Sequence, residues 1–257
     1  MRQIDELKKF SESINGKIIF DYDLKKTNWL NIGGVAKGFF KPENLKEIVE
    51  FLKRFGEKEK IFILGAGSNI LVNDNFFNGI VIKLGKNFSN ISLLSNDTLV
   101  AGSATSDKKL AEFAAKNNIG GLEFLSCIPG TIGGGIRMNS GCFKKEFKDI
   151  VLSVQAVDKI GQVLTIPSSK IKFNYRKTNL DKSLIFLSAT LKGQMSENHK
   201  ITKYMEDLIN EKKKTQPTKI KTGGSTFKNP IDQTEEKVWQ LIKKSVPLDT
   251  KFGDAEI

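Results

Sequence analysis

Two glycine-rich stretches contain the residues best suited to bind a ligand. The first is Gly65-Ala66-Gly67-Ser68-Asn69, and the second runs from Ile128 to Gly141, IPGTIGGGIRMNSG. Because glycine has no Cβ, consecutive backbone N–H groups in such turns can approach a phosphate closely and form an anion-binding nest. Two loops of this kind predict a long ligand with several phosphates. The alternative is that these glycines only permit strands to pack closely.

Neither stretch matches a common nucleotide-binding motif. The first lacks the third glycine and the following helix of a Rossmann fingerprint, and it lacks the Gly-Lys-Ser/Thr of a P-loop. The apolar run Ile70-Leu71-Val72 predicts that a strand follows it. The second stretch is too dense in glycine for a helix, so we expect a loop in which Asn139 and Ser140 act as donors.

The scarcity of histidine and cysteine excludes several kinds of site. His199 is the only histidine, and it lies in a polar segment that favours a surface position. Histidine-based triads and histidine-rich metal sites are therefore hard to build, no metal site is predicted, and acid–base chemistry must use other side chains. Cys127 and Cys142 are too few for a disulfide framework, and the N-terminus does not resemble a signal peptide, so we expect a cytoplasmic protein.

The chain is strongly basic, with a formal charge of +12 at pH 7 over 257 residues. Such a charge suits anionic ligands. No nucleic-acid-binding motif accompanies it, so we expect no nucleic-acid partner, and a lysine-rich surface that keeps the protein soluble is the plain alternative. No apolar run approaches the roughly 20 residues that span a bilayer, so we expect no membrane association.

The elements that must position these stretches are a mixture of helices and strands. Apolar residues at helical spacing predict helices at 42–55, 107–117, around 201–209 and around 238–242. Short apolar runs predict strands at 61–64, 70–72, 79–83, 98–101, 151–157, 163–166 and 183–191. The mixture, with antiparallel hairpins, predicts an α+β fold. A polar stretch from Gly193 to His199 predicts a boundary between two domains, 1–193 and 194–257.

The motifs taken together resemble those of the UDP-N-acetylenolpyruvoylglucosamine reductases, the flavoenzymes that complete UDP-N-acetylmuramic acid in bacterial peptidoglycan synthesis. The resemblance covers nearly the whole chain and depends on the order and spacing of five motifs: Asn28 to Gly34, Leu64 to Val72, Gly121 to Gly134, Asn174-Tyr175-Arg176, and Gly224 to Pro230. It implies an FAD-binding domain of the vanillyl-alcohol-oxidase (PCMH) type over 1–193 and an α+β substrate-binding domain over 194–257. It also implies that the flavin diphosphate lies between the two glycine-rich stretches, with contacts from Gly65, Ala66, Gly67, Ser68, Asn69, Ile128, Pro129, Gly130, Thr131, Gly133, Gly134 and Asn139.

The resemblance further implies a reaction and the residues that carry it. Hydride passes from NADPH to FAD and then to the enolpyruvyl group of UDP-N-acetylglucosamine enolpyruvate, the expected substrate. Arg176 would stabilise the negative charge that develops on the substrate carboxylate, and Ser225 would deliver the proton. Tyr175, Lys228 and Asn229 are implied as substrate-binding residues. Without the resemblance, Arg176 is interpreted as a surface ion-pair residue and Ser225 as a turn residue.

The chain departs from the family at its C-terminus. The family's third catalytic residue, a glutamate, follows a Ser-x-x-His-x-Asn-Phe pattern, but this sequence stops at Ile257, and Glu256 is too close to Ser225 to be the counterpart. We therefore expect a C-terminally truncated member with impaired turnover and with exposed apolar residues at Val238, Leu241 and Ile242. The short interval between Arg176 and Ser225 indicates the shorter type of the family.

Three functions stay open on the sequence. The reductase requires both glycine-rich stretches together with Arg176 and Ser225. Another flavin oxidase or dehydrogenase of the same fold would share the glycine-rich stretches but not the segment Gly224 to Pro230. A non-catalytic binder of flavin or of polyanions is favoured by the charge and by the missing glutamate. Lys213 is a further candidate for a diphosphate contact, with a solvated helix face as the alternative, and we expect a monomer.

Overall fold

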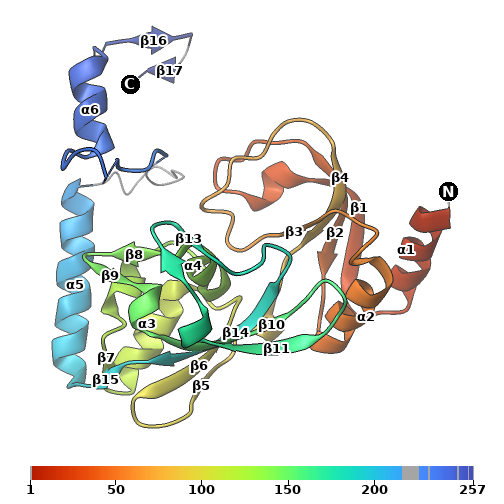
Figure 1. The fold of residues 1–257 in the computed structure, drawn as a ribbon, viewed down its shortest axis with the longest axis horizontal. Helices are drawn as coiled ribbons and strands as arrows, with labels where there is room; N and C mark the ends of the chain where they lie inside the picture. Colours follow the sequence, from red (N-terminus) through yellow and green to blue (C-terminus); the bar gives the residue numbers. More distant parts are fainter. Residues whose placement is uncertain (1, 216–225, 231, 248, 254, 257) are drawn as a thin grey trace. The chain divides into compact units, whose positions relative to one another are not determined.

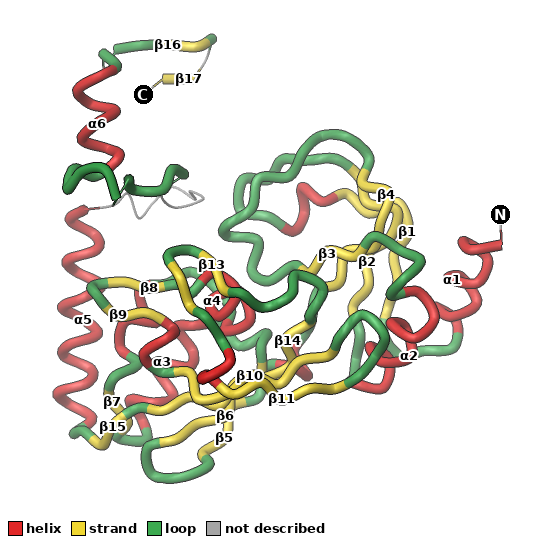
Figure 2. Tube along the Cα trace, viewed as in Figure 1, coloured by secondary structure: helices red, strands yellow, loops and turns green. Residues whose placement is uncertain are grey.

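The chain forms two compact units in the computed structural model, residues 1–222 and residues 223–257. The structure describes residues 2–215, 226–230, 232–247, 249–253 and 255–256. Figure 1 shows the order of the elements, and Figure 2 shows which segments are helix, strand or loop. The larger unit contains a four-stranded sheet, a five-stranded sheet and most of the described helices, and both glycine-rich stretches lie in it.

A four-stranded mixed sheet forms the first part of the larger unit (Figure 1). Its strands are β1 (Lys17–Asp23), β2 (Val35–Lys41), β3 (Ile61–Ile63) and β4 (Phe77–Ile82). The order is β1-β2-β4-β3, with β1 antiparallel to β2 and with β4 parallel to both of its neighbours. Because side chains alternate along a strand, Phe39 and Phe40 of β2 enter different cores, one on each face of the sheet.

Two helices cover one face of this sheet, α1 (Arg2–Glu12) and α2 (Leu45–Phe55). Asn44 caps α2, because its side-chain oxygen accepts a hydrogen bond from the backbone N–H of Glu47 at 3.0 Å. The apolar stripe of α2 is buried with Phe40 and with residues of α1; it consists of Ile48, Phe51, Leu52 and Phe55. This face also receives residues of the second sheet, so the two halves of the larger unit share a core.

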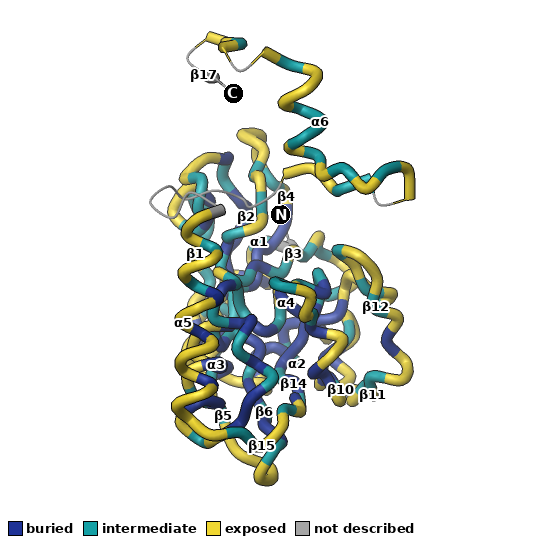
Figure 3. The backbone as a smooth tube through the Cα atoms, turned by 90° about the vertical axis from the view of Figure 1, so that its left-hand side faces the viewer, coloured by how far each residue is buried: buried dark blue, intermediate teal, exposed yellow. Residues whose placement is uncertain are grey.

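The second sheet has five antiparallel strands in the order β11-β10-β14-β6-β5. Its strands are β5 (Ile91–Leu93), β6 (Thr98–Gly102), β10 (Val151–Val157), β11 (Val163–Pro167) and β14 (Ile185–Lys192). Residues of α3 (Asp107–Lys116), α4 (Ile132–Met138) and α5 (Asn198–Thr215) share a core with this sheet. Figure 3 shows buried residues concentrated in the strands, α3 and α4, whereas α5 is largely exposed along its outer side.

Short elements complete the larger unit. The 3-10 helices are η1 (Leu24–Thr27), η2 (Lys86–Phe88), η3 (Glu123–Cys127), η4 (Phe147–Asp149) and η5 (Ser168–Lys170). Three antiparallel pairs join β7 (Ile119–Gly120) to β15 (Gln194–Met195), β8 (Gly141–Cys142) to β9 (Lys145–Glu146), and β12 (Phe173–Asn174) to β13 (Lys177–Thr178). The smaller unit holds α6 (Val238–Ser245), β16 (Lys251–Phe252) and β17 (Ala255–Glu256).

Most of the predicted elements are confirmed, and the α+β class is confirmed with them. The helices predicted at 42–55 and 107–117 are α2 and α3, those around 201–209 and 238–242 are α5 and α6, and the strands at 61–64, 79–83, 98–101, 151–157, 163–166 and 183–191 are β3, β4, β6, β10, β11 and β14. The apolar residues of α6 are not buried in the described part of the smaller unit. No helix among the described residues is both long enough and apolar enough to cross a membrane.

Two sequence predictions are wrong. Ile70-Leu71-Val72 is not a strand: it pairs with no strand among the described residues, Leu71 is 74% exposed, and the chain directly after the run bonds to the loop after η1, where the Gly34 N–H donates to the Asn73 carbonyl at 2.9 Å. The second glycine-rich stretch is not a loop throughout, because residues 132–138 form α4 despite three consecutive glycines.

The predicted boundary after residue 193 does not coincide with the division into compact units. Helix α5 packs against η3 and α3, so it belongs by its contacts to the larger unit. The division into compact units does not show which residues bind substrate. The division into an FAD-binding domain, 1–193, and a substrate-binding domain, 194–257, therefore stays a prediction.

Candidate functional site

The first glycine-rich stretch presents a run of unpaired backbone donors. Within the described residues, none of the backbone N–H groups from Gly65 to Asn69 donates a hydrogen bond to another protein group. These residues are exposed or partly buried, except Gly67, which is buried. Unpaired N–H groups in consecutive positions of a tight turn are the donors of an anion nest.

The residues around the end of η1 contact this stretch and support it. The Trp29 N–H donates to the Gly67 carbonyl at 3.0 Å. Gly67 has φ +73, and a Cβ at this position would lie 2.2 Å from the Thr27 carbonyl oxygen. Asn28 is buried, and its side-chain Nδ2 donates to the carbonyls of Leu24 and Ile32, both at 2.8 Å. The motif from Asn28 to Gly34 therefore supports the turn, and Gly67 is required by both backbone angle and space.

An apolar cavity of about 290 Å³ adjoins the ends of this stretch. Leu64 and Ile70, which flank the stretch, contribute to its wall, and the other apolar lining residues are Leu24, Phe62, Leu71, Val72, Phe76, Phe77 and Val81. Such a cavity next to unpaired donors suits a ligand that has an apolar group attached to an anionic one.

The second glycine-rich stretch begins as an extended segment and continues as α4. Thr131 is the N-cap of α4, and its Oγ1 accepts a hydrogen bond from the Gly134 N–H at 3.5 Å. The N–H groups of Ile132 and Gly133 donate to the carbonyls of Thr105 and Ser103, both at 2.9 Å, and fix α4 to the end of β6. These two amides are thus used within the protein, whereas those of Gly130 and Thr131 have no acceptor among the described residues.

The three consecutive glycines of α4 differ in how much space a side chain would have. A Cβ at Gly135 would lie 2.1 Å from Cε2 of Phe147, and a Cβ at Gly133 would lie 3.1 Å from the Ser103 Cβ. Gly135 therefore needs glycine for packing within the protein, whereas a Cβ at Gly133 would make a tight contact that Ser103 must yield to. Gly134 is exposed, and a Cβ there would meet only Thr131 Oγ1 at 3.5 Å, an ordinary contact.

The structure brings the two stretches together. A Cβ built on Gly65 would lie 2.8 Å from Oγ1 of Thr131, so the first residue of one stretch touches the helix cap of the other. The unpaired N–H groups of the first stretch and those of Gly130 and Thr131 are consequently neighbours. This arrangement fits the diphosphate of FAD, which needs several donors at side-chain-free positions.

A group of buried polar side chains lies behind the second stretch. Ser103 Oγ, Thr105 Oγ1 and both carboxyl oxygens of Asp107 are buried and lack a hydrogen-bond partner within the described residues. A Cβ at Gly130 would lie 2.6 Å from Asp107 Oδ2, so any other residue there would displace the Asp107 carboxyl. Burial raises the pKa of the Asp107 carboxyl well above its usual range, because desolvation disfavours the charged form. The spacing of Ser103, Thr105 and Asp107 along the sequence does not differ from that of an ordinary helix start, so it gives no sign of this group.

Tyr175 and Arg176 form the two-residue tip of the hairpin that joins β12 to β13. Arg176 has φ 56, in the left-handed region, and its guanidinium carbon lies 5.5 Å from the centroid of the Tyr175 ring. Both side chains are at least partly exposed. The hairpin therefore presents its tip outward, as a residue that must reach a ligand requires.

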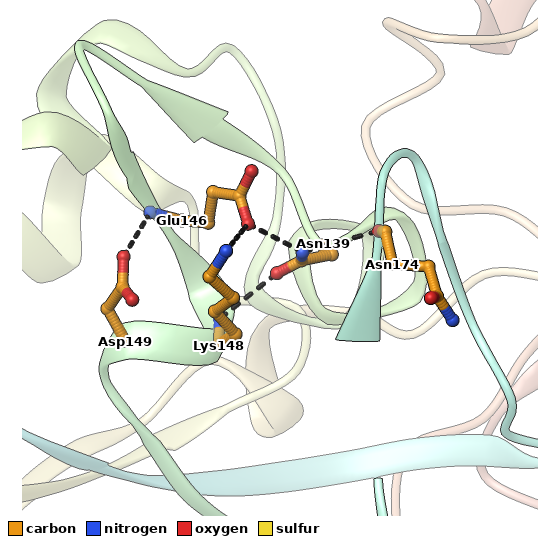
Figure 4. A network of polar contacts seen from close by, with 5 residues as sticks. All are labelled: Asn139, Glu146, Lys148, Asp149 and Asn174. Atoms are coloured by element: carbon orange, nitrogen blue, oxygen red, sulfur yellow. Dashed lines mark hydrogen bonds and ion pairs between the residues drawn. The ribbon is translucent and has the colours of Figure 1, made fainter. Parts of the chain in front are cut away.

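The side chain of Asn139 is engaged by protein groups. Its Nδ2 donates to Glu146 Oε2 at 2.9 Å and to the Asn174 carbonyl at 3.3 Å, and its Oδ1 accepts from the Lys148 N–H at 3.0 Å (Figure 4). The prediction that Asn139 contacts the cofactor stays a prediction, as do those for Ile128, which is partly buried, and Pro129, which is exposed.

A lysine of α5 approaches the start of the second stretch. The Nζ of Lys212 donates to the carbonyl of Cys127, the residue before Ile128. The neighbouring Lys213, which the sequence suggested, is exposed. Helical spacing alone did not reveal which lysine of the basic run faces the stretch, because the run occupies successive positions around the helix.

The remaining predicted residues belong to the smaller unit. Lys228 is exposed, and Oδ1 of Asn229 accepts a hydrogen bond from the Val238 N–H at 3.0 Å, at the beginning of α6. Ser225 lies outside the described residues, and its predicted role as proton donor stays a prediction.

Comparison with known proteins identifies the relatives of the chain. A family profile described as FAD binding domain matches residues 36–167. The UDP-N-acetylenolpyruvoylglucosamine reductase of Pelagibacter ubique (strain HTCC1062) is 63% identical over 254 residues, which are 99% of this chain and 84% of the relative. The protein of the same name from Rickettsia massiliae (strain Mtu5) is 44% identical over 95% of this chain and 81% of its own length.

Solved structures are similar as well. The crystal structure of UDP-N-acetylenolpyruvylglucosamine reductase (MurB) from Thermus caldophilus superposes with a TM-score of 0.80 at 27% identity, over 95% of this chain and 85% of that one. The BBE-like 1 protein of Physcomitrella patens has a TM-score of 0.55 at 17% identity over 74% of this chain and 44% of its own, which is a likeness of fold alone.

Proposed function

The chain belongs to the UDP-N-acetylenolpyruvoylglucosamine reductase family, and we propose that it reduces UDP-N-acetylglucosamine enolpyruvate to UDP-N-acetylmuramate with NADPH as the hydride donor. It is an oxidoreductase with an FAD-binding domain. The observation that carries the proposal is the contact of Gly65 with Thr131, which brings the unpaired N–H groups of two glycine-rich stretches together. The alternative of another flavin oxidase is not favoured, because the relatives carry the reductase name over nearly the whole chain.

FAD would be held through its diphosphate by the N–H groups of Gly65 to Asn69, together with those of Gly130 and Thr131. When bound, FAD supplies the hydride-transfer chemistry that no side chain of the protein has. The exposed position of Gly134 supports a close approach of the cofactor at the start of α4, since packing within the protein does not require glycine there.

Reduction of the enolpyruvyl group adds a hydride to the methylene carbon and a proton to the neighbouring carbon. Negative charge develops on the substrate carboxylate between these events, and we propose that Arg176 stabilises it. A guanidinium is always protonated and can bind a carboxylate in a bidentate manner. Ser225 is proposed to donate the proton, and Tyr175, Lys228 and Asn229 to contact the substrate. A hydroxyl is a weak acid, so this role requires a strongly basic enolate held close to it.

A cytoplasmic location and a role in peptidoglycan precursor synthesis are part of the proposal. Cys127 and Cys142 are both free thiols, as is usual for proteins of a reducing compartment. The compound in the name of the relatives, UDP-N-acetylenolpyruvoylglucosamine, is a nucleotide sugar, and an anionic substrate of this kind suits the basic charge of +12.

The proposal is tested by three additions to one sample. We expect the purified protein to show a flavin absorbance spectrum, or to acquire it with added FAD. NADPH should bleach the flavin under anaerobic conditions, and the enolpyruvyl sugar should restore the colour. The variant Arg176→Met should bind FAD and react with NADPH normally, but its reoxidation by the sugar should be slower by on the order of 10²–10³. A protein that takes up no FAD, or whose reduced flavin is not reoxidised by the sugar, would contradict the proposal.

A further inference from the structure

Asn139 occupies the left-handed position at the end of α4, with φ 43 and ψ 50. Asparagine and glycine are the residues that adopt this conformation most easily, so the backbone alone would accept glycine. The side chain is nevertheless large and 5% exposed, and its amide makes the three hydrogen bonds shown in Figure 4. A buried amide with three partners has a structural task besides ending the helix.

One side of this network is anchored firmly. Glu146, whose side chain accepts from Asn139, is held through its backbone, because its own N–H donates to Asp149 Oδ2 at 2.9 Å (Figure 4). Phe147 follows it in the chain and is fully buried in the core against Phe124. The segment of Glu146 to Asp149 is therefore a fixed support for the Asn139 side chain.

The other side of the network is the hairpin that carries the predicted catalytic arginine. The carbonyl of Asn174 accepts from Asn139 directly before the tip formed by Tyr175 and Arg176. Strands β12 and β13 have only two residues each, and they pair only with each other. A hairpin this short is not stable by itself, so its position depends on contacts with its surroundings.

The same helix also holds the far end of the segment. Arg137 Nη1 donates to the carbonyls of Leu180 and Asp181 at 3.1 and 2.8 Å, and its Nη2 donates to the Leu184 carbonyl at 2.8 Å. Helix α4 thus anchors the chain before the tip through Asn139 and the chain after β13 through Arg137. Its first turn belongs to the glycine-rich stretch that is proposed to approach FAD.

We propose that Asn139 is a positioning residue: its side-chain amide fixes the Arg176 hairpin to the helix whose start contacts the cofactor. The inference rests on the proposed function, in which Arg176 binds the substrate carboxylate; the Asn139 contact keeps Arg176 aligned with that carboxylate. Asparagine suits the task because one amide both donates to Glu146 and Asn174 and accepts from Lys148, whereas a carboxylate would repel Glu146.

The variant Asn139→Gly separates this role from that of ending the helix. Glycine keeps the left-handed cap but removes all three side-chain hydrogen bonds. Asn139→Asp is a second variant that keeps the bond from the Lys148 N–H and loses both donor contacts. Lys148→Met is the matched control. Lys148 donates to Asn139 only through its backbone N–H, which methionine keeps, and the ion pair of its exposed side chain contributes little to stability.

The first readout is hydrogen exchange of the FAD-free protein, followed by mass spectrometry. We expect amides of the hairpin at residues 173–178 to exchange at least tenfold faster in both Asn139 variants than in the wild type or Lys148→Met. Peptides of α3 and the five-stranded sheet should be unchanged. Equal exchange of the hairpin in all four proteins would overturn the proposal, and so would an increase spread evenly over the fold.

The second readout divides the reaction into its halves by rapid mixing. With FAD at saturation, recolouring by saturating sugar should slow at least tenfold more than bleaching by NADPH does in Asn139→Gly. Equal slowing of both half-reactions would show that Asn139 serves the cofactor alone, and an unchanged recolouring rate would show that the hairpin needs no support; either result overturns the inference. Failure of the wild type to be recoloured would instead refute the proposed function.

Discussion

Two adjacent glycines of α4 should respond in opposite ways to the same substitution. Gly134→Ala and Gly135→Ala place one methyl group on neighbouring positions of a seven-residue helix. The new Cβ at 134 meets only Thr131 Oγ1 at 3.5 Å, whereas the one at 135 would lie 2.1 Å from Cε2 and 2.3 Å from Cζ of Phe147. Helix propensity favours alanine equally at both sites, so the difference between the variants reports packing.

The magnitudes follow from these distances. Alanine is about 1 kcal/mol better than glycine within a helix, so Gly134→Ala should raise the free energy of unfolding by up to about 1 kcal/mol. Carbon atoms in contact lie about 3.5–4.0 Å apart, so Gly135→Ala forces the buried Phe147 ring to move by more than about 1 Å. Overpacking of this kind costs about 1–3 kcal/mol, which leaves a net destabilisation of up to about 2 kcal/mol.

Urea unfolding of the FAD-free proteins, followed by tryptophan fluorescence and circular dichroism, measures both changes. Phe147→Leu in the Gly135→Ala background provides the control, because a smaller side chain relieves the clash and the two substitutions should then be less than additive. Equal effects of the two alanine substitutions, or strict additivity with Phe147→Leu, would refute the reasoning. The stabilised Gly134→Ala should nonetheless bind FAD about tenfold more weakly in a spectroscopic titration, because its methyl group lies where the cofactor is proposed to approach.

Three further predictions concern the buried carboxyl of Asp107, the thiol of Cys142 and the ion pair of Lys37. Burial raises the pKa of Asp107, so the folded protein binds this proton more tightly than the unfolded chain, and the free energy of unfolding falls as pH rises from the unfolded pKa towards the folded one. Asparagine cannot ionise, so in urea unfolding Asp107→Asn should stabilise the protein more at pH 7 than at pH 4. The reverse order would contradict the assignment. Burial, together with the neighbouring Cys127 thiol, raises the pKa of Cys142 to about 11, so its alkylation by iodoacetamide at pH 8 should be about 100-fold slower than that of an ordinary thiol; alkylation at the ordinary rate would argue against burial. Lys37 pairs at 2.6 Å with Glu59, whose side chain is 4% exposed, so Lys37→Met should cost about 1–3 kcal/mol of unfolding free energy, whereas a cost below about 0.5 kcal/mol would show that the pair contributes little.

Local patterns in the sequence determined the regular elements and the family. The apolar residues of α2 recur at helical spacing after a capping asparagine, and the run Val151 to Val157 is short and rich in valine, as strands are. Each of these patterns is contained within about a dozen residues of the chain. The five motifs likewise are readable in order along the chain. Both kinds of information are local, so no tertiary contact is needed to interpret them.

Only the tertiary structure decided how the glycine-rich stretches are used. Glycine is a poor helix former, yet residues 132–138 are helical: the N–H groups of Ile132 and Gly133 are bonded to the distant Thr105 and Ser103, and the Phe147 ring packs where a side chain at 135 would lie. The run Ile70-Leu71-Val72 has the composition of a strand, but among the described residues it pairs with no strand and lines the apolar cavity instead. The contact of Gly65 with Thr131 and the bond from Asn139 to the Arg176 hairpin join segments that are 66 and 35 residues apart (131 − 65 and 174 − 139). Composition and spacing carry no information about such pairings, because they are fixed by the folding of two sheets onto a shared core.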